Sequence, residues 1–137
     1  MKIRKLSLVV VSVIVLITSC NTDDRTNQET LTGIWNVRQI SGGVAGINDE
    51  YEPGTITWSF NNQILIVDNN ENQGNTYSGL ESGTYNFSTI EIDGVNYIII
   101  NNAEYGSYTL SIDSLTINQN QTSSGPGADG FILQFEK

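Results

Sequence analysis

From residue 31 onward, apolar and polar residues alternate with a period of two in several short runs, as in β-strands that bury one face. Asn, Thr, Ser, Gly and Ile dominate this part of the chain and alanine is scarce, which favours strands and turns over helices. The pattern predicts strands near residues 33–40, 54–60, 63–68, 82–92, 95–101, 106–112, 115–120 and 130–137.

Three short turns are expected to set the register of the hairpins, namely Asn61-Asn62, Asp93-Gly94 and Asp113-Ser114. Residues that flank a two-residue turn lie opposite each other and share a face of the sheet. Trp58 is therefore expected opposite Leu65.

By the same rule, Leu110 is expected opposite Ile117, and Ile112 opposite Leu115. Each hairpin then carries a mostly apolar set of side chains on one face. Such a face has to be covered, either by a second sheet or by closure of the sheet into a barrel.

The connections alternate between tight turns and longer segments, which are expected at 41–53, 69–81, 102–105 and 121–129. In an up-and-down meander this alternation places the tight turns at one end and the longer loops at the other. The sequence therefore predicts an all-β fold, an eight-stranded antiparallel up-and-down barrel over residues 31–137, with a closed end and a mouth.

The interior of such a barrel is expected to be crowded, because the inward positions carry many bulky residues that leave little room for a cavity. A β-bulge near Ser88-Thr89 would bring the apolar residues of the fourth strand into phase. The inward candidates are Trp35, Val37, Ile56, Trp58, Phe60, Leu65, Val67, Tyr85, Phe87, Tyr97, Ile99, Tyr108, Leu110, Ile112, Leu115, Ile117, Phe131, Leu133 and Phe135.

The first twenty residues have the pattern of a processed leader. A basic start at 1–5 precedes the apolar run Leu6–Ile17, which is too short to span a bilayer and matches a signal-peptide core. The run ends in Ile17-Thr18-Ser19-Cys20, which resembles the lipobox of bacterial lipoproteins. The resemblance implies a signal peptide at 1–19 and a lipid on Cys20 that anchors the chain to a membrane.

Residues 20–30 are expected to form the lipidated cysteine and a flexible tether, because 21–30 hold no apolar side chain. Asn21, rather than Asp, follows Cys20, and this favours the outer membrane in the cell envelope, on its periplasmic face or at the cell surface. The chain enters the barrel at the end with the tight turns, so the mouth is expected to point away from the membrane.

The first strand contains Gly33-x-Trp35, which resembles the signature of lipocalins and their bacterial lipocalin-like relatives. The resemblance covers about residues 31–137 and implies that Gly33 and Trp35 lie at the barrel floor. It also implies a basic residue over the Trp ring, a part that only Lys137 could play, and a calyx that holds a small apolar ligand.

Charge and composition exclude several functions. The leader holds three of the six cations and no acid, so the rest of the chain has three cations, 15 acids and a net charge of −12, which does not suit nucleic acid. The chain has no histidine, and Cys20 is its single cysteine, so histidine and thiol catalysis and zinc sites are not expected. We expect a monomer that is not an enzyme and carries no cofactor.

One loop resembles the first half of a calcium site, with oxygen-bearing side chains at Asp68, Asn70 and Asn72. The glycine falls one residue late, at Gly74, and Gly79 stands where the bidentate Glu would be. The alternative is a polar loop rich in turn-forming Asn, and no metal site is expected.

The ligand candidates are aromatic residues of the longer loops and the interior: Tyr51, Tyr77, Tyr105, Trp58 and Tyr108. The same loops carry many acids, so the mouth is expected to attract cations and to repel fatty acids, while Arg38 points outward by alternation. The sequence therefore predicts binding of a small apolar or cationic ligand in the barrel. The alternative is a non-catalytic module with a filled barrel that contacts a protein or glycan through its acidic loops.

Overall fold

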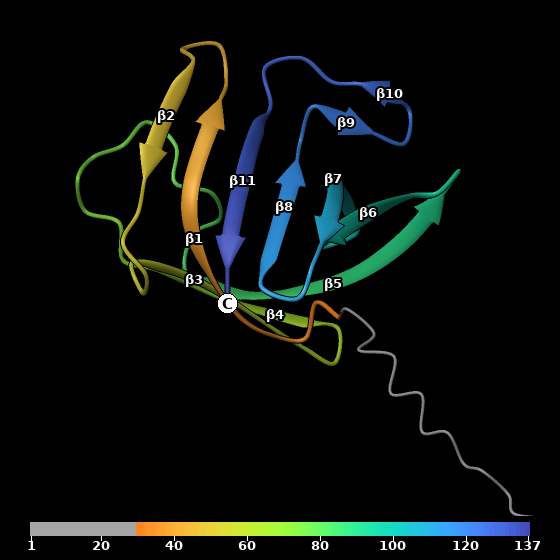
Figure 1. Ribbon diagram of the computed structural model, residues 1–137, viewed down its shortest axis with the longest axis horizontal. Coiled ribbons are helices and arrows are strands. Elements are labelled where there is room, and N and C mark those ends of the chain that lie inside the picture. The colour runs from red at the N-terminus through yellow and green to blue at the C-terminus, as the bar shows by residue number, and fades with distance from the viewer. Residues whose placement is uncertain (1–29) are drawn as a thin grey trace, which may run out of the picture.

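The computed structural model describes residues 30–137, and the expected leader, Cys20 and tether up to residue 29 lie outside the described residues. The described part contains no helix (Figure 1), and none of it could therefore serve as a helical membrane span. Its strands are β1 (Gly33–Gly42), β2 (Ile47–Glu50), β3 (Ile56–Asn61), β4 (Ile64–Asn69), β5 (Gly83–Ile92), β6 (Val95–Ile100), β7 (Ala103–Leu110), β8 (Ser114–Asn118), β9 (Gln121–Thr122), β10 (Gly125–Pro126) and β11 (Phe131–Glu136).

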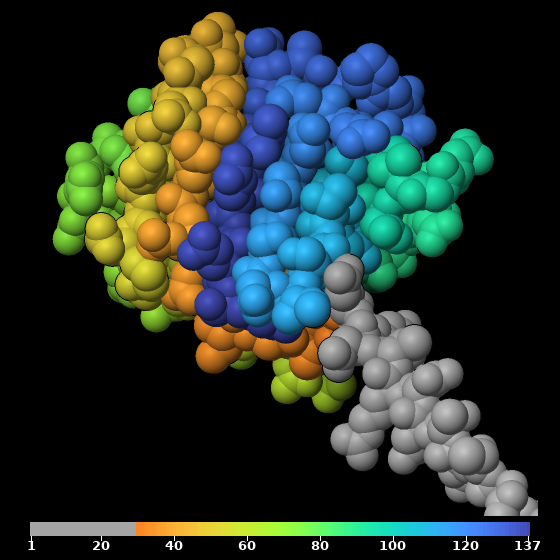
Figure 2. All heavy atoms as spheres, viewed as in Figure 1, coloured from red at the N-terminus to blue at the C-terminus, as the bar shows by residue number. Residues whose placement is uncertain are grey.

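Eight of these strands close into an antiparallel barrel in the order β1–β3–β4–β5–β6–β7–β8–β11, and β11 pairs again with β1. The predicted all-β fold, an eight-stranded antiparallel barrel, is confirmed, and it is compatible with a lipocalin-like fold. Figure 2 shows β1, β11 and β8 packed side by side as a continuous wall. The chain enters β1 at the end of the barrel where the β3–β4 and β5–β6 turns lie.

The longer connections contain more structure than the sequence pattern indicated. The segment 41–53 forms a hairpin, in which β2 pairs with Gln39–Gly42 of β1 beyond the part of β1 that pairs with β3. The segment 121–129 contains the small β9–β10 ladder. The loop expected at 102–105 is instead the tight turn Asn101-Asn102, in which both residues have positive φ and Ile100 lies opposite Ala103.

The β3–β4 hairpin turns at Asn62-Gln63 rather than at Asn61-Asn62. Both turn residues have positive φ, at 45° and 66°, as a tight hairpin turn with the right twist requires. Trp58 therefore lies opposite Val67, not opposite Leu65. The error shifts the register by an even number of residues, so the expected buried face is still correct.

The β7–β8 register was also predicted wrongly, since Leu110 lies opposite Leu115 and Tyr108 opposite Ile117. Ile112 is then part of a loop and is 61% exposed, whereas alternation placed it inside. The hydroxyls of Ser111 and Ser114 hydrogen-bond each other at 2.6 Å and close this loop.

Strand β6 places the opposite phase of its apolar run in the core from the one expected, although Tyr97 is also buried outside the core cluster. Ile98 and Ile100 belong to the core, whereas Ile99 faces outward. The pairing of β5 with β6 has no bulge near residues 88–89, and the irregularity lies between β6 and β7 at Tyr105. Gly106 follows it with φ +151°, and a Cβ there would lie 2.6 Å from the carbonyl oxygen of Asn118.

Large side chains fill the barrel interior. The fully buried set comprises Trp35, Trp58, Phe60, Phe135, Ile40, Ile56, Leu65, Ile98, Leu115, Ile117, Leu133 and Val37. The ring of Trp58 lies 5.1 Å from that of Phe135, and Phe60 lies 4.9 Å from Phe87 with the rings nearly perpendicular. The interior is therefore a packed core like that of other small eight-stranded barrels.

At the end of the barrel where the chain enters β1, the floor is built around Trp35. Its side chain is fully buried, and its indole Nε1 donates a hydrogen bond of 2.7 Å to the carbonyl oxygen of Leu31. The Nζ atom of Lys137 lies 4.8 Å from the centre of the Trp35 ring. These contacts join the two ends of the barrel chain at one point.

Candidate functional site

The mouth of the barrel is closed by a tyrosine of the β4–β5 loop. The Tyr77 ring stacks on Phe131 with centroids 3.8 Å apart and planes 8° from parallel. Its hydroxyl lies 3.0 Å from the hydroxyl of Tyr105 and accepts a hydrogen bond of 3.1 Å from Nε2 of Gln119. Tyr77 thus links β7, β11 and the turn that follows β8 across the opening.

Side-chain hydrogen bonds from Asn69 and Tyr51 fix the position of the loop that carries Tyr77. Nδ2 of Asn69 donates to the carbonyl oxygens of Ser78 and Leu80, at 3.1 and 2.9 Å. Tyr51 donates its hydroxyl proton to the carbonyl oxygen of Tyr77 at 3.4 Å. Burial raises the pKa of Tyr51, so that it keeps this proton.

Beneath Tyr77, the chain of rings continues into the core. The ring of Tyr105 lies 5.7 Å from that of Trp58, and burial raises the pKa of Tyr105. Nε1 of Trp58 is buried and has no hydrogen-bond partner among residues 30–137. Tyr108 lies opposite Ile117 on the inner face and packs against the core.

The structure therefore brings four of the five aromatic ligand candidates into one connected cluster. Tyr51, Tyr77, Tyr105 and Trp58 contact one another in series from the rim to the core. The three tyrosines fill the mouth and Trp58 lies in the core, so these residues do not line an open calyx.

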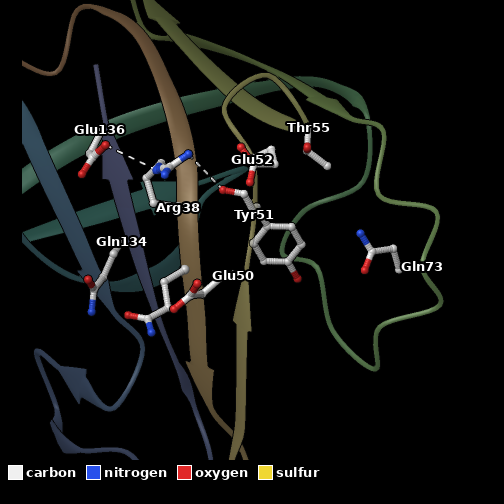
Figure 3. Close-up of a pocket in the computed structure, with 9 residues that line it drawn as sticks. Arg38, Glu50, Tyr51, Glu52, Thr55, Gln73, Gln134 and Glu136 are labelled. Atoms are coloured by element: carbon white, nitrogen blue, oxygen red, sulfur yellow. Dashed lines mark hydrogen bonds and ion pairs between the residues drawn. The ribbon is translucent and has the colours of Figure 1, made fainter.

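A groove of about 460 Å³ lies instead on the outer wall of the barrel (Figure 3). Strands β1, β2 and β11 form it together with the β2–β3 connection and one residue of the β4–β5 loop. Its lining residues are Arg38, Gln39, Glu50, Tyr51, Glu52, Thr55, Gln73, Gln134 and Glu136. Only Tyr51 belongs both to this groove and to the aromatic cluster of the mouth.

Arg38 lies between Glu136 and the main chain of Tyr51 in this groove, as Figure 3 shows. Its Nη1 atom donates a hydrogen bond of 3.1 Å to the carbonyl oxygen of Tyr51, and its Nε atom lies 3.4 Å from Oε2 of Glu136. The Arg38 side chain is 34% exposed and that of Glu136 is 66% exposed. The ion pair adds little to stability at that exposure, but it orients the guanidinium along the groove.

A β-bulge explains why the groove has this composition. The pairing of β1 with β11 shifts between Val37 and Gln39, so Arg38 is the extra residue and stays on the outer wall, as alternation predicted. The bulge also changes the phase of β1, which sends Ile40 into the core and leaves Gln39 outside. Gln39 and Gln134 are then opposite each other on neighbouring strands.

The groove offers both donors and acceptors. The three glutamine amides and Arg38 can donate hydrogen bonds, while the carboxylates of Glu50, Glu52 and Glu136 accept them. Three carboxylates and one guanidinium give these side chains a net charge of −2. Such a surface suits a neutral or cationic ligand that carries many hydroxyl or amine groups.

Sequence reasoning missed most of the groove. The sequence pattern places Glu50 and Glu52 among the acids of a longer loop, but Gln39, Gln73 and Gln134 carry no local signal. They converge only because β2 folds back along β1 and because the β4–β5 loop reaches the same wall.

Two of the three side chains of the calcium candidate, Asp68 and Asn70, contact each other. Nδ2 of Asn70 donates a hydrogen bond of 3.1 Å to Oδ1 of Asp68 within the loop. Within residues 30–137, no group of three or more His, Cys, Asp or Glu side chains could hold a metal ion.

The fold and the site define an all-β protein, a filled eight-stranded barrel with a polar groove on its outer wall. Comparisons of the chain with protein-family models, with curated proteins and with solved structures find no match.

Proposed function

We propose that this protein is a lipid-anchored binding module of the cell envelope, attached through Cys20, whose outer groove holds a hydroxyl-rich ligand such as a glycan. The barrel acts as a rigid, non-catalytic support. The module works as a monomer at the outer membrane. The single observation that carries the proposal is the contrast between the packed interior and the polar groove on the outer wall.

The packed interior supports a site outside the barrel. Trp35 fills its floor, and Trp58 and Phe60 fill its centre, each with at most 1% of its surface exposed. Tyr77 closes the mouth above them. A ligand in the calyx would have to displace several of these side chains, at a large cost in packing. The groove needs no such rearrangement.

The chemistry of the groove supports a glycan over other ligands. A sugar hydroxyl both donates and accepts, so it can pair with an amide N–H of Gln134 and with a carboxylate such as Glu50 at once. The net negative charge disfavours sialic acids, uronic acids and phosphosugars. Neutral and amino sugars are the expected class.

A glycan array carrying neutral, amino and anionic oligosaccharides tests this function. We expect binding to neutral or amino glycans and none to the anionic set. For a glycan bound on the array, Gln134→Ala should weaken the affinity by about 3–10-fold, the loss of one or two neutral hydrogen bonds.

Thr109→Ala is the matched control, because Thr109 is exposed on the outer wall of β7, away from the groove. It should leave the affinity unchanged. Binding of anionic glycans alone, or equal losses for Gln134→Ala and Thr109→Ala, would contradict the groove as the site.

A calyx ligand is the second candidate, and the unpartnered Nε1 of Trp58 favours it. If Tyr77 and its loop moved away, this N–H would be a donor at the end of an apolar cavity. A small apolar or cationic molecule with one acceptor atom would suit that position. The Trp58 indole N–H is therefore the natural reporter of calyx binding.

A further inference from the structure

Strand β5 is longer than β4, which pairs with one of its two edges. Its first residues, Gly83–Asn86, pair with β4, and the last contact on this side is a hydrogen bond of 2.8 Å from the amide of Phe87 to the carbonyl oxygen of Gln63. The chain turns away at that point into β3. Among residues 30–137, no strand pairs with Ser88–Ile92 on this edge, although β6 pairs with them on the other.

The direction of the free main-chain groups follows from that last hydrogen bond. In an antiparallel strand, the N–H and C=O of alternate residues point to the same edge. The Phe87 amide points toward β4, so the N–H and C=O groups of Thr89 and Glu91 point to the unpaired edge. Ser88, Ile90 and Ile92 use their groups toward β6.

The same segment exposes apolar side chains on its outer face. Ile90 is 44% exposed and Ile92 is 37% exposed, and they lie opposite Tyr97 and Val95 of β6. In Figure 1 this part of the β5–β6 hairpin projects from the side of the barrel. An unpaired edge next to an apolar face is the arrangement that accepts an added strand.

A second copy of the chain could pair with this edge in three antiparallel registers. They set Thr89 opposite Thr89, Thr89 opposite Glu91, or Glu91 opposite Glu91. Two of them place a residue of the second copy opposite Phe87, where Gln63 already lies. The third sets Glu91 against Glu91 of the second copy, and like charges directly opposite destabilise a sheet. A second copy is therefore a poor occupant.

We propose that the Ser88–Ile92 edge binds an extended segment of another protein by antiparallel strand addition. The segment carries apolar residues on the face of Ile90 and Ile92, and Lys or Arg on the face of Glu91. The charge of Glu91 selects this partner, and the free N–H and C=O groups of Thr89 and Glu91 hold it. This site is separate from the outer groove.

A blocked pentapeptide of sequence Ile-Lys-Ile-Lys-Ile is a suitable probe, with Ile-Glu-Ile-Glu-Ile as the matched peptide of opposite charge. Added at millimolar concentration to the ¹⁵N-labelled protein, the lysine peptide should shift the amide signals of Thr89 and Glu91 in a saturable way and slow their hydrogen exchange. It should bind at least threefold more tightly than the glutamate peptide.

Two variants test the same edge. Glu91→Lys should reverse the preference, so that the glutamate peptide binds more tightly, which a merely unfolded variant could not do. Thr89→Pro removes an N–H that faces the free edge and leaves the β5–β6 pairing in place, so it should abolish binding of both peptides.

The proposal is overturned if the lysine peptide leaves Thr89 and Glu91 unchanged, or if both peptides bind wild type and Glu91→Lys equally. It is also overturned if the two amides are already protected in the free protein, by a second copy or by residues 20–29. Amide signal shifts confined to the groove residues would place the peptide in the groove and would also overturn the proposal.

Discussion

Replacing Trp58 by alanine is expected to lower the free energy of unfolding by about 3–5 kcal/mol. The Trp58 side chain is fully buried and lies against Phe60, Phe135 and Tyr105, at ring distances of 6.1, 5.1 and 5.7 Å. Its removal leaves a cavity at the centre of the barrel that these rings cannot close. Urea unfolding followed by circular dichroism measures the loss.

Trp58→Phe is the control for this substitution. Phenylalanine keeps most of the aromatic contacts and removes the buried N–H that has no partner within the described part of the chain. We expect a loss below about 1.5 kcal/mol, because a buried donor without an acceptor is itself unfavourable. A loss below about 1 kcal/mol for Trp58→Ala would show that the core is not packed around this residue.

Replacing Trp35 by alanine should have a similar effect, a loss of about 3–5 kcal/mol. The substitution removes a fully buried ring, the hydrogen bond to Leu31 and the contact with Lys137. Because these contacts join the start and the end of the barrel, strands β1 and β11 should lose hydrogen-exchange protection first. Exchange measured by mass spectrometry after proteolysis resolves the two strands.

Lys137→Ala measures the contribution of the cation separately from that of the Trp35 ring. The Lys137 side chain is exposed, and an exposed cation–π contact contributes at most about 1 kcal/mol. Its loss should therefore be much smaller than that of Trp35→Ala. Equal losses for the two variants would mean that the lysine, not the buried indole, secures the floor.

Alternation of apolar and polar residues was enough to predict the strands and their buried faces. The buried faces were correct even where the register was wrong, because a register error of two residues leaves each side chain on the same face. The β3–β4 hairpin shows this, since its turn lies one residue later than expected while Ile56, Trp58 and Phe60 are buried as predicted. The composition of the turn, Asn-Asn-Gln, supports either position.

The phase of β6 could not be predicted, because the run Tyr97–Ile100 is apolar at every position. Alternation gives no signal in such a run. The bulge at Tyr105 and the inward position of Ile98 are decided by the packing of neighbouring strands. Ile112 was misplaced for a related reason, since it lies in a loop that periodicity treats as strand.

The candidate site was predicted only in part. The tyrosines of the longer loops were expected at the mouth and do gather there, but they close it. The groove depends on a bulge at Arg38 and on four chain segments that are distant in sequence. No local pattern marks such a convergence.

Ligands are expected to bind on the outer wall and not inside the barrel, and one NMR titration distinguishes the two sites. A ¹⁵N-labelled form that starts at residue 20 and carries Cys20→Ser is titrated with an array-selected glycan and, separately, with lauric acid and the dye ANS as calyx probes. We predict that the glycan shifts the side-chain amides of Gln39 and Gln134, and that no probe moves the Trp58 indole N–H. A saturable shift of that indole signal, with the groove amides unchanged, would contradict the account.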